Sequence, residues 1–176
     1  MVKLIFKFLI IFFKKKLLNY FKFFFFKRGY IYILTNFNYF YNIIFFLNKS
    51  SFFQFKILID VIVSDYPEKF YRFLISYSLL SIKFNLRLNL IFCFKELFPI
   101  ISIKRLFYSS NWLEREIWDF YGIFFIFNND LKRLFLDYGF EGYPLRKDFP
   151  LYGYLEIFYN QPSNSLFYTQ VQINKD

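Results

Sequence analysis

Residues 86–92 read LRLNLIF, and this short stretch decides the fold class. Apolar side chains stand at positions 86, 88, 90 and 92 and alternate with Arg87, Asn89 and Ile91. A spacing of two residues is typical of a β-strand that buries one face, because successive side chains of a strand point to opposite sides of the sheet. The stretch therefore predicts a half-buried strand near the middle of the chain.

The flanking sequence supplies further strands. Residues 53–63 are apolar and rich in β-branched residues, and the turn signal Asp65-Tyr66-Pro67 follows them. A similar run covers residues 70–80, and a shorter one covers residues 100–103. With several strands before residue 104 and short helices after it, we predict an α+β fold: a single domain with a central β-sheet and flanking helices, followed by an extended C-terminal segment.

The chain has 176 residues, enough for one domain with a real core and a terminal extension. We divide it into a basic, Phe- and Lys-rich N-terminal extension with a first strand and helix (1–50), a core domain (51–127), and a short helix with an extended C-terminal segment (128–176).

Within the N-terminal extension, residues 1–28 fit a surface-lying amphipathic helix, residues 30–34 a strand and residues 37–47 a buried helix. The uncharged stretch 29–48 is disfavoured as a membrane span because its Asn side chains would have to enter hydrocarbon.

Positive charge is concentrated in the N-terminal third. Residues 1–56 hold nine Lys, Arg28 and no acid, and this accounts for the whole net charge of +10, since residues 57–176 hold 13 basic and 13 acidic side chains. The lack of Ala and His beside abundant Phe, Ile, Tyr, Asn and Lys indicates an AT-rich, organellar gene. The basic extension predicts contact with phospholipid headgroups or RNA, and codon drift in a tolerant tail stays open as the alternative.

The residue composition changes at residue 111, where the chain reads NWLEREIWDFYGIFF and combines both Trp residues with four charges in six positions. Asn111 is a good N-cap, Glu114 three residues later completes a capping box, and Gly122 suits the C-terminal stop. The resulting helix should carry an apolar face around Ile117, an Arg115–Asp119 pair one turn apart, and exposed charges.

Two further features follow this helix. In NNDLKRLFLDYG, Asp130 can cap a second helix of two turns that ends near Gly139. After it, Pro144 and Pro150 bracket residues 145–149, forbid a continuous helix and predict an extended backbone. Such a charged, extended piece cannot build its own core, so it needs another surface to pack on.

The strings NWLEREIWDFYGI, DLKRL and DYGFEGYPLRKDFPLYGYLE resemble the 30-kilodalton subunit family of respiratory complex I, NADH:ubiquinone oxidoreductase. With weaker matches upstream, through Asp65 and Arg72, the likeness covers residues 57–159. It implies a core subunit of the hydrophilic (peripheral) arm, on the matrix side of the mitochondrial inner membrane. It implies no cofactor on this chain, although the assembly uses NADH, FMN, iron-sulfur clusters and ubiquinone.

The same resemblance implies partners and contact residues. The partners are other complex I subunits, chiefly the 49-kilodalton quinone-site subunit, which the C-terminal segment wraps, and the subunit that holds the terminal iron-sulfur cluster. The expected contact residues are Trp112, Glu114, Arg115, Glu116, Asp119, Asp130, Lys132, Arg133, Asp137, Glu141, Pro144, Leu145, Arg146, Lys147, Asp148, Phe149 and Pro150. Among these we expect Arg146 and Asp148 to contribute most of the binding energy, on one shared face. The chain departs from the family at Asn128 and Asn129, which replace His-Pro, and at Tyr143, where His is common.

Several enzyme classes are excluded by residue type. Without His the chain can form neither a Ser-His nor a Cys-His nucleophile, and the single Cys93 cannot build a Cys-based metal cage. Glu114 and Glu116 are not a catalytic pair, because two residues along a helix turn side chains about 200° apart. No phosphate-binding Gly motif is present. We predict no catalytic site of its own. An organelle-encoded ribosomal protein with an RNA-contacting tail is the alternative function, disfavoured because residues 57–176 are neutral, so no nucleic acid partner is expected.

Overall fold

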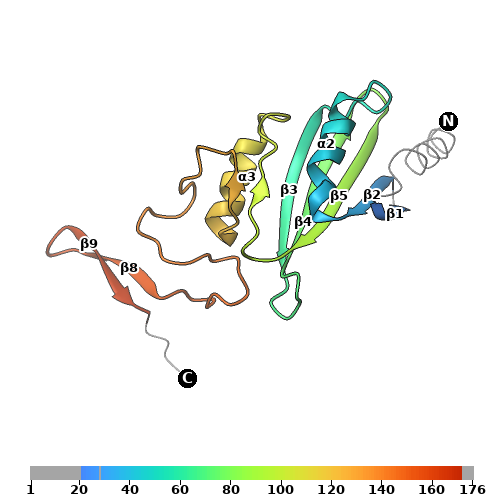
Figure 1. Cartoon of the computed structure of the whole chain (residues 1–176). Helices are drawn as coiled ribbons and strands as arrows, with labels where there is room; N and C mark the ends of the chain where they lie inside the picture. The colour runs from blue at the N-terminus through green and yellow to red at the C-terminus, as the bar shows by residue number, and fades with distance from the viewer. Residues whose placement is uncertain (1–20, 28, 172–176) are drawn as a thin grey trace.

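The computed structural model describes residues 21–27 and 29–171. A five-stranded sheet in the order β1-β2-β5-β4-β3 forms its centre (Figure 1). Its strands are β1 (Phe21–Lys27), β2 (Tyr30–Thr35), β3 (Ile57–Asp65), β4 (Phe73–Ser81) and β5 (Leu86–Phe94). All neighbouring strands are antiparallel except β2 and β5, which are parallel. The predicted α+β class with a central sheet is therefore confirmed.

The core lies between this sheet and helix α2 (Phe40–Lys49), which the short 3-10 turn η1 (Phe37–Tyr39) precedes. Strand β5 buries every second residue from Leu86 to Phe94, as its alternation predicts. The Phe40 ring of α2 lies 4.6 Å from the Phe92 ring, centroid to centroid. Burying one such side chain stabilises the fold by about 1.5–3 kcal/mol. The predicted strand at 30–34 and buried helix at 37–47 are confirmed.

The surface helix predicted for residues 1–28 is wrong for residues 21–27, which form strand β1. This strand pairs with the edge of β2, so its backbone gains hydrogen-bond partners, and the Phe25 ring stacks on Tyr32 at 4.8 Å. The rest of that prediction, residues 1–20 and 28, lies outside the described residues. In the part of the chain that the structure describes, no helix is both long and apolar enough to cross a membrane.

Helix α3 (Ser110–Tyr121) lies in the chain between two short strands, β6 (Ile100–Ile101) and β7 (Phe125–Ile126), which pair in parallel. The predicted stop is confirmed: Gly122 has a φ of +69°, and its N–H donates to the Trp118 carbonyl oxygen at 2.9 Å. A side chain at Gly122 would also meet the Tyr143 ring at 2.5 Å. The predicted capping box is wrong, because the helix begins one residue earlier and Asn111 lies inside it.

The C-terminal segment differs most from expectation. The helix predicted after Asp130 does not form; residues 127–154 run as turns and irregular backbone over the domain. Residues 144–149 form turns rather than extended chain. The Arg146 N–H donates to the Tyr143 carbonyl oxygen and the Phe149 N–H to the Arg146 carbonyl oxygen, both at 3.2 Å. Strands β8 (Leu155–Asn160) and β9 (Ser165–Gln170), which the sequence did not predict, form a hairpin that projects from the domain (Figure 1).

Candidate partner interface

Helix α3 turns its charges inward, contrary to the prediction that it presents them. Glu114 is fully buried, and its carboxylate accepts hydrogen bonds from the Ser102 hydroxyl (2.6 Å), the Ile103 N–H (2.9 Å) and the Asn128 amide (2.9 Å). Burial raises the pKa of Glu114, and these three donors only partly oppose the rise. Asn128 thus serves as a neutral donor to a buried carboxylate.

Asp119 explains why residues 130–139 do not form a helix. Its carboxylate accepts the N–H groups of Leu134, Phe135 and Leu136 at 3.1, 2.8 and 3.1 Å, so these groups are not available to helical carbonyls. Arg133 also donates to Asp119 at 2.9 Å. Burial would raise the pKa of Asp119, but these four donors outweigh it and the pKa is lowered.

The two arginines of this region, Arg115 and Arg133, both donate to backbone carbonyl oxygens, and Arg133 donates to the Asp119 carboxylate as well. Arg133 donates to the carbonyl oxygens of Asp119 and Phe140, both at 2.9 Å. Arg115 donates to the carbonyl oxygens of Lys132 (3.5 Å) and Arg133 (3.3 Å) and lies 5.0 Å from the Trp112 ring. The expected Arg115–Asp119 pair is therefore wrong, because Asp119 pairs with Arg133 instead.

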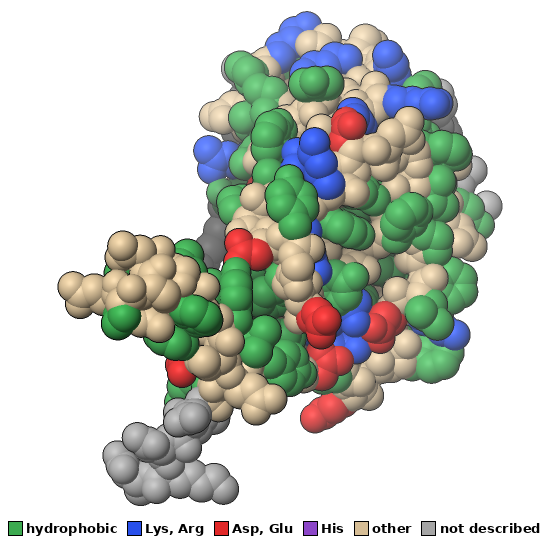
Figure 2. All heavy atoms as spheres, turned by 90° about the vertical axis from the view of Figure 1, so that its left-hand side faces the viewer, with side chains coloured by type: hydrophobic (Ala, Val, Ile, Leu, Met, Phe, Trp, Pro, Cys, Tyr) green, Lys and Arg blue, Asp and Glu red, His purple; other side chains and the backbone are tan. Residues whose placement is uncertain are grey.

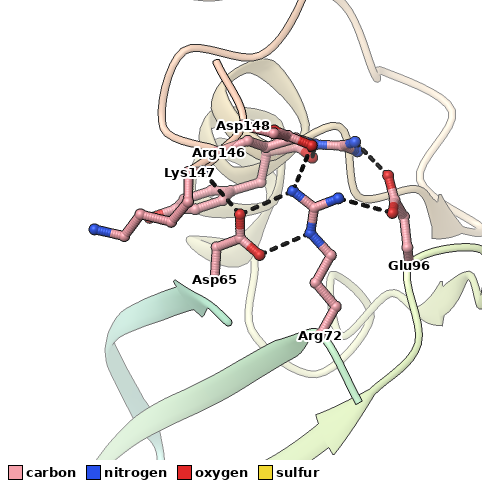
Figure 3. Close-up of polar contacts among 7 residues, drawn as sticks. Asp65, Arg72, Glu96, Arg146, Lys147 and Asp148 are labelled. Atoms are coloured by element: carbon pink, nitrogen blue, oxygen red, sulfur yellow. Dashed lines mark hydrogen bonds and ion pairs between the residues drawn. The ribbon is translucent and has the colours of Figure 1, made fainter. Parts of the chain in front are cut away.

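A second cluster of charges joins the β3–β4 connection to the C-terminal segment (Figure 3). Arg72 holds the fully buried Asp65 carboxylate with two hydrogen bonds, of 2.7 Å from Nε and 2.9 Å from Nη2. The Lys147 N–H donates to the same carboxylate at 2.9 Å. This bidentate arrangement suits the planar guanidinium group of arginine.

The outer members complete a network of five charged side chains. Arg72 also donates to Glu96 (2.9 Å) and Asp148 (2.8 Å), and Arg146 pairs with Glu96 from the other side. The Arg146 Nε donates to the Tyr121 carbonyl oxygen at 2.6 Å, at the end of α3. Residues 146–148 are thereby fixed to the sheet and to α3 at once.

The network shifts the ionisation of its central pair. Burial would raise the pKa of Asp65, but the hydrogen bonds from Arg72 and the Lys147 N–H lower it below its usual range. The hydrogen bond to Asp65 and the further acids raise the pKa of Arg72. Both groups are therefore charged at neutral pH.

Beyond these anchors the segment exposes apolar surface. Leu151 is 93% exposed, Tyr138 86% and Phe135 62%. The projecting hairpin continues this surface (Figure 2), with Leu155, Ile157, Phe158, Tyr159, Leu166, Phe167 and Tyr168 all exposed. Because a hairpin of two strands is at best marginally stable in water, this surface needs a partner.

The structure divides the predicted contact residues into three groups. Glu114, Arg115 and Asp119 are buried and offer a partner almost no side-chain surface. Arg146 and Asp148 both pair within the network of the chain itself, and Asp148 still exposes 56% of its side chain. The remaining residues are exposed or half-buried: Trp112, Glu116, Asp130, Lys132, Arg133, Asp137, Glu141, Pro144, Leu145, Lys147, Phe149 and Pro150.

Sequence reasoning missed the hairpin and Glu96. Asp65 and Arg72 were among the upstream matches to the family, but nothing in the sequence indicated that they meet Asp148, which is 76 positions from Arg72. The apolar alternation of residues 155–160 was the available signal for the hairpin. Among the described residues, no group of three or more Cys, Asp or Glu side chains is placed to hold a metal ion.

These features define a class of protein: an α+β domain whose C-terminal segment is anchored by buried carboxylates and exposes apolar surface. The comparisons with known proteins give the family. The family model described as "Respiratory-chain NADH dehydrogenase, 30 Kd subunit" matches residues 34–155, so the chain belongs to this family. The match begins at residue 34, whereas the sequence likeness given above began at residue 57.

Relatives and solved structures agree. The chain is 48% identical over 145 residues to "NADH-ubiquinone oxidoreductase subunit 9" of Acanthamoeba castellanii, covering 82% of this chain and 73% of that protein. It is 39% identical over 142 residues to "NADH dehydrogenase [ubiquinone] iron-sulfur protein 3" of Arabidopsis thaliana, covering 81% and 75%. The trypsin-resistant fragment of Nqo5 superposes with a TM-score of 0.53 at 25% identity, covering 58% of this chain and 83% of the fragment. The ribosomal alternative has no support from these comparisons.

Proposed function

We propose that the chain is a structural, non-catalytic subunit of the peripheral arm of mitochondrial NADH:ubiquinone oxidoreductase, and that residues 135–168 bind a neighbouring subunit. The apolar surface of this segment carries the proposal, together with its fixation by the Asp119 and Asp65 clusters. The residues that these clusters hold, 134–136 and 146–148, lose little conformational entropy when a partner binds, so less of the free energy of the apolar contact is spent on ordering them.

The finer assignment follows from the family. We assign the segment to the 49-kilodalton subunit that holds the quinone site, with the subunit of the terminal iron-sulfur cluster as second neighbour, on the matrix side of the inner membrane. NADH, FMN, clusters and ubiquinone would bind to other subunits. The lack of His and the single Cys93 support this assignment, since they leave the chain without the usual cluster ligands.

Substitution of the hairpin tests the docking role. Ile157 and Tyr168 face each other across β8 and β9 and are 51% and 60% exposed. The double variant Ile157→Ser with Tyr168→Ser should fail to enter the assembled enzyme on native gels. Tyr108→Ser, at an 80% exposed residue that precedes α3, is the matched control and should assemble normally. Equal assembly of the two variants would show that the hairpin is not the docking element.

The non-catalytic role has a direct test. The purified full-length chain should oxidise no NADH and carry neither metal nor flavin, as measured by dye reduction, elemental analysis and absorbance. A stoichiometric metal or a visible chromophore on the chain would contradict the proposal.

A further inference from the structure

Five basic residues lie at the end of the sheet opposite the Asp65 network. The strand register brings them together: Lys27 in β1 is opposite Tyr30, Tyr30 is opposite Arg87, and Arg87 is opposite Leu80 at the end of β4. Ile57 of β3 also pairs with Leu80, and Lys56 directly precedes it. We call this set the basic pole: Lys27, Lys49, Lys56, Lys83 and Arg87.

Among the described residues, the partners found for Lys56, Lys83 and Arg87 are neutral. Lys56 donates to the carbonyl oxygen of Asn48 at 2.5 Å, which ties it to the end of α2, where Lys49 also stands. Arg87 donates to the Tyr30 hydroxyl at 2.8 Å, and the Lys83 ammonium lies 5.6 Å from the Phe84 ring. All five residues are exposed. Their charge is therefore held in place but not neutralised.

The segments that build the basic pole contain no acid. Residues 1–59 and 80–87 hold neither Asp nor Glu. The first acid of β3 is Asp60, whose carboxylate accepts a hydrogen bond from the Val61 N–H at 2.8 Å. In Figure 2, Lys and Arg side chains gather at the upper end of the face shown and most Asp and Glu at the lower end. At the Asp65 end of the sheet, Arg72 and Arg146 pair with three carboxylates. The two ends of one sheet thus differ in the balance of charge.

Exposed apolar side chains stand among these cations. Phe52, in the loop after α2, is 66% exposed, and Ile82, beside Lys83 in the β4–β5 turn, is 70% exposed. Apolar contacts surrounded by charged ones are the usual anatomy of a protein–protein interface. Attraction of five cations to a lipid surface, at about 1 kcal/mol each, would be weak and salt-sensitive. A permanent subunit needs a firmer contact.

We infer that the basic pole is a second docking surface, distinct from the C-terminal segment, and that it takes an acidic face of a neighbouring protein subunit with apolar side chains at its centre. This inference rests on the proposed function, because it supposes a multisubunit assembly. Arg87 is the residue best suited to a bidentate carboxylate contact, since its guanidinium is already oriented by Tyr30. The charge of the pole comes partly from residues beyond position 56, so it is not a property of a basic tail alone.

Zero-length carbodiimide cross-linking tests the inference in the purified enzyme, because it joins a lysine only to a carboxylate in direct contact. Lys49, Lys56 and Lys83 should each link to Asp or Glu of one neighbouring subunit, and acetylation of these lysines should be slower in the enzyme than in the free chain. Lys69, exposed at the opposite end of the sheet, is the control lysine. Acetylation at equal rates in enzyme and free chain would overturn the inference. Protection that disappears on delipidation or ribonuclease treatment would also overturn it, in favour of lipid or RNA.

A charge reversal completes the test. Lys27→Glu with Lys83→Glu should lower retention of the subunit in the enzyme by about ten-fold at moderate salt, and Asp→Lys or Glu→Lys at the cross-linked site of the neighbour should restore it. Lys69→Glu should have no such effect, and all variants should keep the melting temperature of the free chain. Normal retention of the double variant would refute the docking role of the basic pole and leave the proposed function standing. Failure of the unaltered chain to copurify with NADH dehydrogenase activity would refute the proposed function, and with it this inference.

Discussion

Asp119 and Asp65 both fix the C-terminal segment from a fully buried carboxylate, but they do so in different ways. Asp119 accepts three successive backbone N–H groups and one arginine, all within 17 positions of itself. Asp65 accepts one backbone N–H, and its arginine also reaches two outer acids. The first cluster therefore decides the local path of the chain, whereas the second sets where that path meets the sheet. Only the second cluster contains further acidic partners for its arginine.

The largest effect should follow from Asp119→Ala. It removes the only acceptor shown for the N–H groups of residues 134–136 and leaves Arg133 with backbone oxygens alone, so we expect a loss of about 3–5 kcal/mol in the free energy of unfolding. Urea unfolding of the full-length chain measures it. Asp130→Ala, at an exposed aspartate paired with Lys104, is the control and should change little. Similar losses in both variants would mean that the Asp119 cluster is not the principal anchor.

Arg72→Met should be less costly, because it keeps the aliphatic stem and Asp65 keeps the Lys147 N–H. We expect a loss of about 1.5–3 kcal/mol, the range for hydrogen bonds to charged groups. Proteolysis between residues 144 and 150 should become faster, while the 130–139 region stays protected by Asp119. Faster cleavage in both regions would show that the two clusters are one cooperative unit rather than two.

Acid should weaken both clusters. The pKa values of Asp65 and Asp119 are lowered in the folded chain, so their stabilisation is fully present above the unfolded pKa of about 3.9 and is lost as pH falls through the folded values. Glu114 has the opposite sign: its pKa is raised, so its contribution decreases as pH rises from its unfolded value toward its folded value. Unfolding measured from pH 3 to pH 7 should show the acid loss, and Asp119→Asn should flatten it. An unchanged slope in that variant would contradict the assignment.

The smallest effect on stability should come from Arg146→Ala, whose contacts are the half-exposed Glu96 and one carbonyl oxygen. We expect about 1 kcal/mol in unfolding, yet a clear defect in assembly, because residues 144–150 would no longer be fixed where the docking segment begins. Lys104→Ala, which breaks only an exposed pair with Asp130, should be silent in both measurements. Native gels measure how much of each variant enters the assembled enzyme. Equal incorporation of Arg146→Ala and Lys104→Ala would show that Arg146 and its pair with Glu96 do not contribute to docking.

Much of the sheet could be predicted from sequence, because its strands bury alternate residues and alternation is visible in residues 86–94. Helix α3 was predictable for the same local reason, as was its stop at Gly122. The direction of its charges was not predictable. An amphipathic pattern suggests that charges face water, but Glu114 and Asp119 accept hydrogen bonds from the segments that directly precede and follow the helix.

The segment after residue 127 shows the same limit more strongly. Local signals favoured a capped helix after Asp130, and the side chain that prevents it belongs to α3. The prolines at 144 and 150 were read as forcing extended backbone, whereas tertiary bonds from Arg146 and Lys147 select turns between them. The family resemblance named residues of this segment as one set, but not which of them face one another within the chain.

The parallel pairing of β2 with β5 has a consequence for synthesis of the chain. Strand β2 ends at Thr35, and its partner β5 begins 51 positions later, at Leu86. During translation from the N-terminus, the β1–β2 hairpin and its Phe-rich edge must wait until β3, β4 and β5 have left the ribosome. A nascent chain halted before Leu86 should therefore depend on chaperones, and one halted after Phe94 should not.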